Sequence, residues 1–257
     1  MNTKRRHLSV KILFAALILL LAAPLPASAN HPWGEYHWAR TANPFTIKVV
    51  DSMTTDWDDN LDLAISDWDQ SSVMNVVEEA GSDSAKTRQL CRAAKGKVRS
   101  CNYTYGINGW LGLAQIWVRG VHITQGTAKM NDSYLASSSY SETNRQHVVC
   151  QEIGHDWGLG NQDESGADLN TCMDYSDQLD NPSPNAHDYE QLEIIYAHLD
   201  SSTTIGAAPK GFENADVHAQ ENWGELVSQS ADGRAALYVR DFGRGYKIFT
   251  WVVWAGE

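Results

Sequence analysis

The pattern of apolar and polar positions divides the chain into short strands and a few longer helices. Alternating or β-branched apolar runs predict strands, and in the first half of the chain these runs are residues 45–50, 73–77, 102–107, 112–118 and 123–130. Apolar residues at helical spacing predict helices, and these cover residues 56–69, 141–159 and 187–199. Strands and helices in this order indicate an α+β fold.

The last part of the chain has a different pattern. Residues 201–213 are rich in Ser, Thr, Gly, Ala and Pro, as is typical of a linker. Two strand-like runs, 235–240 and 247–254, then flank a Gly-rich turn. Because so short a segment buries little apolar surface by itself, we expect a small β-hairpin extension. The linker and extension would span residues 201–257, after a main domain over residues 30–200.

The first residues have the features of an export signal. Basic residues precede an apolar run from Ile12 to Ala23, and Ala27-Ser28-Ala29 has the small-x-small form of a signal-peptidase site. The run is shorter than the roughly 20 apolar residues that span a bilayer. We therefore predict a signal peptide over residues 1–29 and a secreted mature chain without a membrane anchor.

The charge balance narrows the classes of partner. The leader contains four basic residues and no acidic one, so its removal changes the formal net charge from −12 to −16. Such a surface repels the phosphates of nucleic acids and of anionic lipids. We expect neither nucleic-acid binding nor membrane binding. The acidic residues also make calcium a candidate ion, although the sequence contains no EF-hand-type loop.

Four cysteines lie in the exported part of the chain, at Cys91, Cys101, Cys150 and Cys172. Disulfides are the default in an oxidising compartment, and four cysteines allow three pairings. Proximity along the sequence favours Cys91–Cys101 and Cys150–Cys172. The second pair would tie the helix that contains Cys150 to the segment around Met173.

The candidate chemistry lies in the segment CQEIGHDWGLGNQDE. Gln151 and His155 are four residues apart, so they project from the same side of a helix, with Glu152 beside them. Gly158 is placed to end the helix. Asn161 follows at a distance where a turning chain brings its side chain back toward His155.

This layout resembles the zinc helix of the metzincin metalloproteases, whose pattern is H-E-x-x-H-x-x-G-x-x-H or D. Glu152, His155 and Gly158 match that pattern. Gln151 and Asn161 stand where two of the zinc ligands belong. A looser similarity to a matrixin-like group of exported prokaryotic proteins with a Q-E-x-G-H motif would make Gln151 a trait of that group.

A second family feature follows the helix. The segment TCMDY, residues 171–175, looks like the Met-turn that lies beneath the metal in metzincins, with Met173 as a packing residue. The resemblance covers residues 45–199. It implies a twisted mixed sheet, a long active-site helix, the Met-turn and a C-terminal helix. Residues 112–118 would be the edge strand against which an extended peptide substrate pairs.

The resemblance also implies zinc as the cofactor. Catalytic zinc usually has three protein ligands and a bound water whose pKa it lowers toward ~7. Glu152 would be the general base and His155 the one strong ligand, with the amides of Gln151 and Asn161 as weaker donors. Asp163 is the best replacement for a lost ligand, because a carboxylate is an ordinary zinc donor.

Other histidines are weaker alternatives as ligands. His122 and His187 are distant in sequence, and either could fold toward the helix. His147 lies on the same helix face as His155. Eight residues nevertheless separate the two by about 12 Å along the axis, which is too far for them to share one ion.

Two functions are consistent with the motif. The first is a secreted zinc-dependent metalloendopeptidase that hydrolyses peptide bonds with metal-activated water and Glu152 as general base. The second is a catalytically impaired pseudoprotease that binds a peptide or a surface partner. The missing histidine ligands at positions 151 and 161 leave both functions open.

Overall fold

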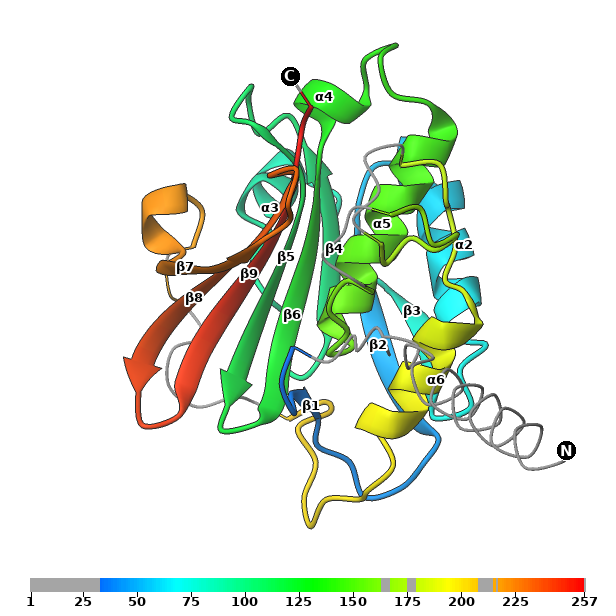
Figure 1. The fold of residues 1–257 in the computed structure, drawn as a ribbon, viewed down its shortest axis with the longest axis vertical. Helices are drawn as coiled ribbons and strands as arrows, with labels where there is room; N and C mark the ends of the chain where they lie inside the picture. Colours follow the sequence, from blue (N-terminus) through cyan, green and yellow to red (C-terminus); the bar gives the residue numbers. More distant parts are fainter. Residues whose placement is uncertain (1–32, 163–166, 175–178, 208–214, 216, 257) are drawn as a thin grey trace, which may run out of the picture.

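A computed structural model describes residues 33–162, 167–174, 179–207, 215 and 217–256 (Figure 1). The predicted signal peptide, residues 1–29, and the predicted ligand Asp163 lie outside the described residues. Within the described ranges, no helix combines the length and the apolar composition needed to cross a bilayer.

One β-sheet forms the centre of the molecule, with nine strands among the described residues. The strands are β1 (His37–Trp38), β2 (Phe45–Ser52), β3 (Met74–Ala80), β4 (Val98–Tyr103), β5 (Trp110–Arg119), β6 (His122–Asn131), β7 (Glu225–Gln229), β8 (Ala235–Gly243) and β9 (Tyr246–Trp254). Their order is β3-β2-β4-β6-β5-β9-β8-β7, with β1 beside the start of β6. The pairs β3–β2, β2–β4 and β4–β6 are parallel. The pairs β6–β5, β5–β9, β9–β8 and β8–β7 are antiparallel. The sheet is therefore mixed, and the fold is α+β as predicted.

The longer helices gather on one side of this sheet (Figure 1). The helical elements are η1 (Thr55–Trp57), α2 (Asp58–Trp68), α3 (Ala85–Leu90), α4 (Asp132–Leu135), α5 (Glu142–Asp156), α6 (Ala186–Ile195) and η2 (Gln220–Asn222). Helix α5 packs on β5 and β6 and against α2. The three predicted helices correspond to α2, α5 and α6, whereas the shorter elements had no clear periodic pattern.

The local sequence explains where α5 begins and ends. The Ser141 hydroxyl accepts a hydrogen bond from Asn144 N at 3.2 Å, and Asn144 Oδ1 accepts one from Ser141 N at 2.8 Å. This reciprocal pair satisfies two backbone donors at the helix start. Gly158 follows the helix with φ +94°, a conformation that residues with a side chain rarely adopt. A Cβ at this position would also overlap the backbone oxygen of Tyr36. The helix therefore ends at Asp156, before the end that the sequence pattern placed at Leu159.

Strand β4 lies earlier in the chain than predicted. The prediction covered residues 102–107, whereas the strand covers Val98–Tyr103. The inward-facing positions of β4 include Ser100 and Asn102, both of which are buried. Because these buried residues are polar, hydrophobic alternation did not reveal the strand.

The C-terminal hairpin is part of the main sheet rather than a separate appendage. Strand β9 pairs antiparallel with β5 along its length, from Trp110↔Trp254 to Arg119↔Tyr246. Because β6 occupies the other side of β5, the prediction that residues 112–118 form an open edge for a peptide is wrong. The long apolar run of β9 explains this position, since a strand buried on both faces reads as continuous hydrophobic sequence.

Both predicted disulfides are present. Cys91 is bonded to Cys101, and Cys150 is bonded to Cys172, each with a Cα–Cα distance of 6.0 Å. The first closes the loop between α3 and β4, and the second joins α5 to the segment that follows it. Two disulfides are compatible with a secreted protein.

Candidate functional site

Helix α5 places Gln151, Glu152 and His155 within about one turn of each other. Their exposed fractions are 2%, 0% and 1%. The helix is enclosed because the sheet lies on one side of it, α2 on another, and β9 against its C-terminal part. Solvent therefore has almost no access to these side chains in the described part of the chain.

Glu152 and Asp156 point into the interface between α5 and the sheet. A Cβ at Gly112 in β5 would overlap the Glu152 carboxylate, and one at Gly126 in β6 would overlap that of Asp156. Neither carboxylate has a hydrogen-bond partner of normal geometry among the described residues. Burial raises the pKa of Glu152 well above its usual range, and Asp156 raises it further, while the Ala114 backbone N–H offsets part of the rise. Burial also raises the pKa of Asp156.

The Gln151 amide is held by the chain itself. Its Nε2 donates hydrogen bonds to Asn161 Oδ1 at 3.1 Å and to the backbone oxygen of Asp174 at 3.0 Å. The amides of Gln151 and Asn161, which the sequence placed at metal-binding positions, are therefore hydrogen-bonded to each other. Asp163, the proposed replacement ligand, lies outside the described residues.

The His155 ring is stacked on Trp251 of β9, with ring centroids 4.4 Å apart and planes within 5° of parallel. His155 Nδ1 is hydrogen-bonded to the backbone oxygen of Leu159 at 2.9 Å. Catalytic zinc needs three good donors and an open position for water. Among the described residues of this motif, one stacked imidazole beside two amides that are hydrogen-bonded to each other does not supply that set. The described residues therefore do not fit a zinc ion in this arrangement.

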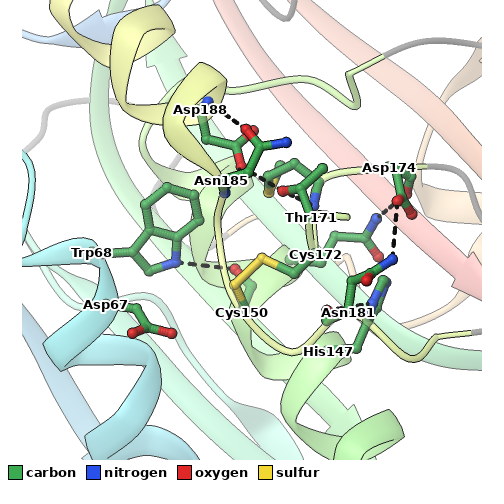
Figure 2. Close-up of a disulfide and its surroundings, with 12 residues drawn as sticks. Asp67, Trp68, His147, Cys150, Thr171, Cys172, Asp174, Asn181, Asn185 and Asp188 are labelled. Atoms are coloured by element: carbon green, nitrogen blue, oxygen red, sulfur yellow. Dashed lines mark hydrogen bonds between the residues drawn. A yellow bond between two sulfur atoms is a disulfide. The ribbon is translucent and has the colours of Figure 1, made fainter. Parts of the chain in front are cut away.

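The disulfide between Cys150 and Cys172 fixes the segment after α5 (Figure 2). Nε1 of Trp68 in α2 donates to the Cys150 backbone oxygen at 3.2 Å. On the other side, the fully buried His147 is hydrogen-bonded through Nδ1 to the backbone oxygen of Asn181 at 2.9 Å. The histidine that was too far along the helix to be a ligand thus contacts the segment after α5.

Met173 lies against α5 and has no exposed surface. Its backbone N–H donates to the Thr171 hydroxyl at 3.1 Å, and that hydroxyl donates to the Asp188 carboxylate in α6. Burial raises the pKa of Asp188 to about 6, with hydrogen bonds from Thr171 and Asn185 lowering it in part. The turn at Met173 is therefore connected to both α5 and α6.

The contact between α5 and Met173 depends on Gly154. Replacing Gly154 with alanine should lower the free energy of unfolding by about 1–3 kcal/mol, as overpacking of a tight core does. The new Cβ would overlap Met173 Sδ and lie 2.7 Å from Trp68 Cζ2. Urea denaturation followed by circular dichroism measures the change. Thr143→Ala, at an exposed position of the same helix, is the control, and equal midpoints for the two variants would contradict the expected overlap.

A second group of chemically active side chains lies away from α5. His37, His122 and Asp200 each offer a ligand atom, these atoms all lie within 4.8 Å of one another, and the group could hold a metal ion. His122, one of the alternatives for the α5 site, belongs to this group instead. His187, the other alternative, lies near Glu190 on α6, with Nδ1 3.9 Å from Oε2.

Sequence reasoning missed this second group because its members are far apart in the chain. Two of its side chains come from strands β1 and β6, and Asp200 follows α6. The one local signal is the spacing His198-x-Asp200, two donors that leave the end of a helix together. Such a pair is common on exposed loops, so it does not indicate a site by itself.

A pocket of about 390 Å³ opens between α3 and the ends of β4, β5 and β6. Its lining residues are Gln89, Leu90, Tyr103, Thr104, Tyr105, Asn108, Trp110, Leu113, Lys129 and His218. Leu113 and Lys129 lie opposite each other in the β5–β6 ladder. Because their neighbour Gly112 faces α5 and successive residues of a strand face opposite ways, the pocket lies on the sheet face away from α5.

No protein-family model matches the chain, and a search of the curated proteins gives no significant match. The metzincin resemblance therefore remains a prediction from the sequence motif. The function has to be inferred from that motif and from the contacts of the described residues.

Proposed function

We propose that the protein is a secreted metzincin-like pseudoprotease, a non-proteolytic protein that binds a peptide or protein partner. The mixed sheet, the long helix α5, the turn near Met173 and the following helix α6 support the family part of this proposal. They occur in the order that the resemblance implies.

One observation supports the loss of activity most directly: the chain itself fills the places that proteolysis requires. The Gln151 and Asn161 amides are bonded to each other rather than arranged as ligands. Strand β9 lies along β5, where an extended substrate would pair, and Trp251 covers His155. A metal would have to break the hydrogen bond between Gln151 and Asn161, and a substrate would have to displace β9 from β5.

The pocket on the far face of the sheet supports a binding role. Its size lies within the ~300–1,000 Å³ typical of ligand sites. Aromatic side chains line it, with Tyr103 and Tyr105 at a centroid distance of 5.6 Å and Tyr105 and Trp110 at 4.9 Å. Aromatic residues dominate the energy of protein interfaces, so a peptide side chain is a suitable occupant.

The mature chain, residues 30–257, should release no product from a mixture of quenched fluorescent peptides above the rate of its Glu152→Gln variant. The reason is that Glu152 is fully buried and its neighbours supply a single imidazole. The assay is run with added zinc and again with a chelator. Cleavage that disappears both with the chelator and in Glu152→Gln would contradict the proposal and establish the endopeptidase.

The binding role has a separate test. Peptides selected from a random library on the mature chain should bind Tyr103→Ala at least about tenfold more weakly, the effect of losing an interfacial aromatic worth ~1.4 kcal/mol. Phe242→Ala is the matched control, because this aromatic is 39% exposed on the β8–β9 hairpin. Peptides that bind both variants and the parent equally would exclude the pocket.

The zinc-dependent endopeptidase remains the second candidate function. One feature favours it, namely that α5 presents a carboxylate and an imidazole, Glu152 and His155, within a single turn. For this function to operate, the β8–β9 hairpin would have to leave α5, since Trp251 stacks on His155.

A further inference from the structure

Four side chains converge where β1, β6 and the segment after α6 meet. His37 and His122 direct their Nε2 atoms toward Asp200, and His198 lies beside His37. His122 Nε2 lies 3.1 Å from Asp200 Oδ1, and His37 Nε2 lies 3.4 Å from the same oxygen. His198 Nε2 lies 3.2 Å from His37 Nε2 and 3.9 Å from Asp200 Oδ1.

The fold brings these donors together through backbone contacts. Strands β1 and β6 are parallel partners in which His37 is directly opposite His122. The segment after α6 returns to β1, where Asp200 N donates to the Arg40 backbone oxygen at 2.9 Å. The rings of His37 and His198 then lie with their centroids 4.5 Å apart. Three separate parts of the chain therefore supply the four donors.

Hydrogen bonds on the outer side of the group orient two of the donors. His37 Nδ1 lies 2.7 Å from the Glu35 backbone oxygen, which can only accept. The Nδ1 proton is therefore used there, and the Nε2 lone pair of the neutral ring faces the other donors. Burial lowers the pKa of His37, although the contacts with Glu35 and Asp200 counteract part of this effect.

The Asp200 carboxylate is oriented in the same manner. Its Oδ2 accepts from Arg40 Nη1 at 2.8 Å and from Arg40 N at 3.2 Å. Its Oδ1 is the oxygen nearest to His122. Arg40 is 1% exposed and also donates from Nη2 to the His198 backbone oxygen. One buried guanidinium thus positions both the carboxylate and the segment that presents His198.

The contacts of Asp200 Oδ1 with His37 and His122 have spacings close to those of a tetrahedral metal site. Zinc lies about 2.0–2.2 Å from imidazole nitrogen and carboxylate oxygen, so neighbouring donors in a tetrahedron lie about 3.3 Å apart. The separations of 3.1, 3.2 and 3.4 Å fall close to this value, and the 3.9 Å between His198 and Asp200 exceeds it. His198 lies outside the group of three whose ligand atoms are all within 4.8 Å of one another, so its side chain, which is 54% exposed, would have to rotate to complete the tetrahedron. The chemistry also fits, because imidazole and carboxylate are ordinary zinc donors.

We propose that His37, His122, His198 and Asp200 form a zinc site that cross-links β1, β6 and the segment after α6. Four protein ligands leave no open position, so the ion has a structural role. His122 and His198 are 34% and 54% exposed, which allows the ion to enter from solvent. The site is separate from α5 and does not depend on whether the protein cleaves peptides.

Zinc titration of the chelator-treated mature chain tests the site. Isothermal titration calorimetry should give one equivalent of zinc per chain, and zinc should raise the melting temperature, since an ion that binds only the folded state stabilises it. X-ray absorption spectroscopy should show three nitrogen ligands and one oxygen ligand at about 2.0–2.2 Å. Failure to bind a stoichiometric ion would overturn the proposal.

Variants of the exposed ligands locate the ion. His198→Ala and His122→Ala should each weaken zinc binding by more than ~100-fold, because loss of even an outer-shell partner of a ligand costs about 10–100-fold. His187→Ala is the matched control, since this histidine lies on α6 and contacts Glu190. Circular dichroism of the zinc-free proteins identifies any variant that fails to fold.

The same measurements separate this site from the one predicted on α5. Zinc that is retained by the double variant His122→Ala/His198→Ala but lost from His155→Ala would place the ion on α5. That result would overturn the proposed cross-link and favour the endopeptidase. The peptide-cleavage assay with Glu152→Gln judges the pseudoprotease proposal separately, because neither His122 nor His198 belongs to α5.

Discussion

Replacing Trp251 with alanine should lower the free energy of unfolding by about 3–5 kcal/mol, the usual loss for a buried tryptophan. Trp251 is 4% exposed and belongs to the main hydrophobic core. It stacks on His155 of α5 and meets Trp33 edge-on at a centroid distance of 5.9 Å. Its removal therefore loosens the contact between the C-terminal hairpin and α5. Urea denaturation followed by circular dichroism measures the loss.

Trp251→Phe is the matched control, because a smaller ring retains part of the stack on His155. It should lose clearly less stability than Trp251→Ala. If Trp251→Ala unfolds at the urea concentration of the parent, the hairpin does not hold α5 in the way described. If Trp251→Ala gains zinc-dependent peptide cleavage, the hairpin is an inhibitory element and the pseudoprotease proposal fails.

Glu152→Gln and Asp156→Asn should both make the protein more stable than the parent near neutral pH. The pKa of each carboxyl is raised by burial in the folded state. Above about pH 4 the unfolded chain loses these protons while the folded chain keeps them. The parent therefore loses stability as pH rises through this window, by up to ~1.4 kcal/mol per pH unit for each group. The amide variants avoid this loss.

Denaturation curves recorded at several pH values between 4 and 8 measure this effect. The difference between each variant and the parent should grow with pH and should be small near pH 4, where the unfolded chain has lost only about half of these protons. Asp241→Asn, at an exposed position of β8, is the control and should follow the parent throughout. If the free energies of unfolding of Glu152→Gln and of the parent change equally with pH, Glu152 is not buried as a neutral acid.

The features that the sequence predicted well are those encoded by neighbouring residues. The apolar spacing of α5 is local, and so are the two disulfides, whose cysteines lie close together in the chain. The strand-forming runs of β5 and β6 are equally local. The relation between Gln151, Glu152 and His155 followed from helical geometry alone.

The features that the sequence did not predict depend on contacts between distant residues. The run from residue 246 to 254 reads as a strand whether it forms an isolated hairpin or pairs with β5. The choice is made by tertiary packing, with Trp251 against His155. The group around Asp200 combines residues from three parts of the chain, and no spacing rule connects His37 with His122 or His198. Burial of the α5 carboxylates likewise depends on what covers the helix.

The pairing of β9 with β5 has a consequence for how the protein folds during synthesis. Ala114 in β5 is opposite Trp251 in β9. The centre of the sheet therefore pairs a strand that is synthesised early with the last strand among the described residues. Contacts of such long sequence separation form slowly. A chain arrested before Tyr246 would present β5 with a row of unpaired backbone groups, a known template for aggregation. Folding should therefore require synthesis of the hairpin, and chains that lack the hairpin should be the aggregation-prone species.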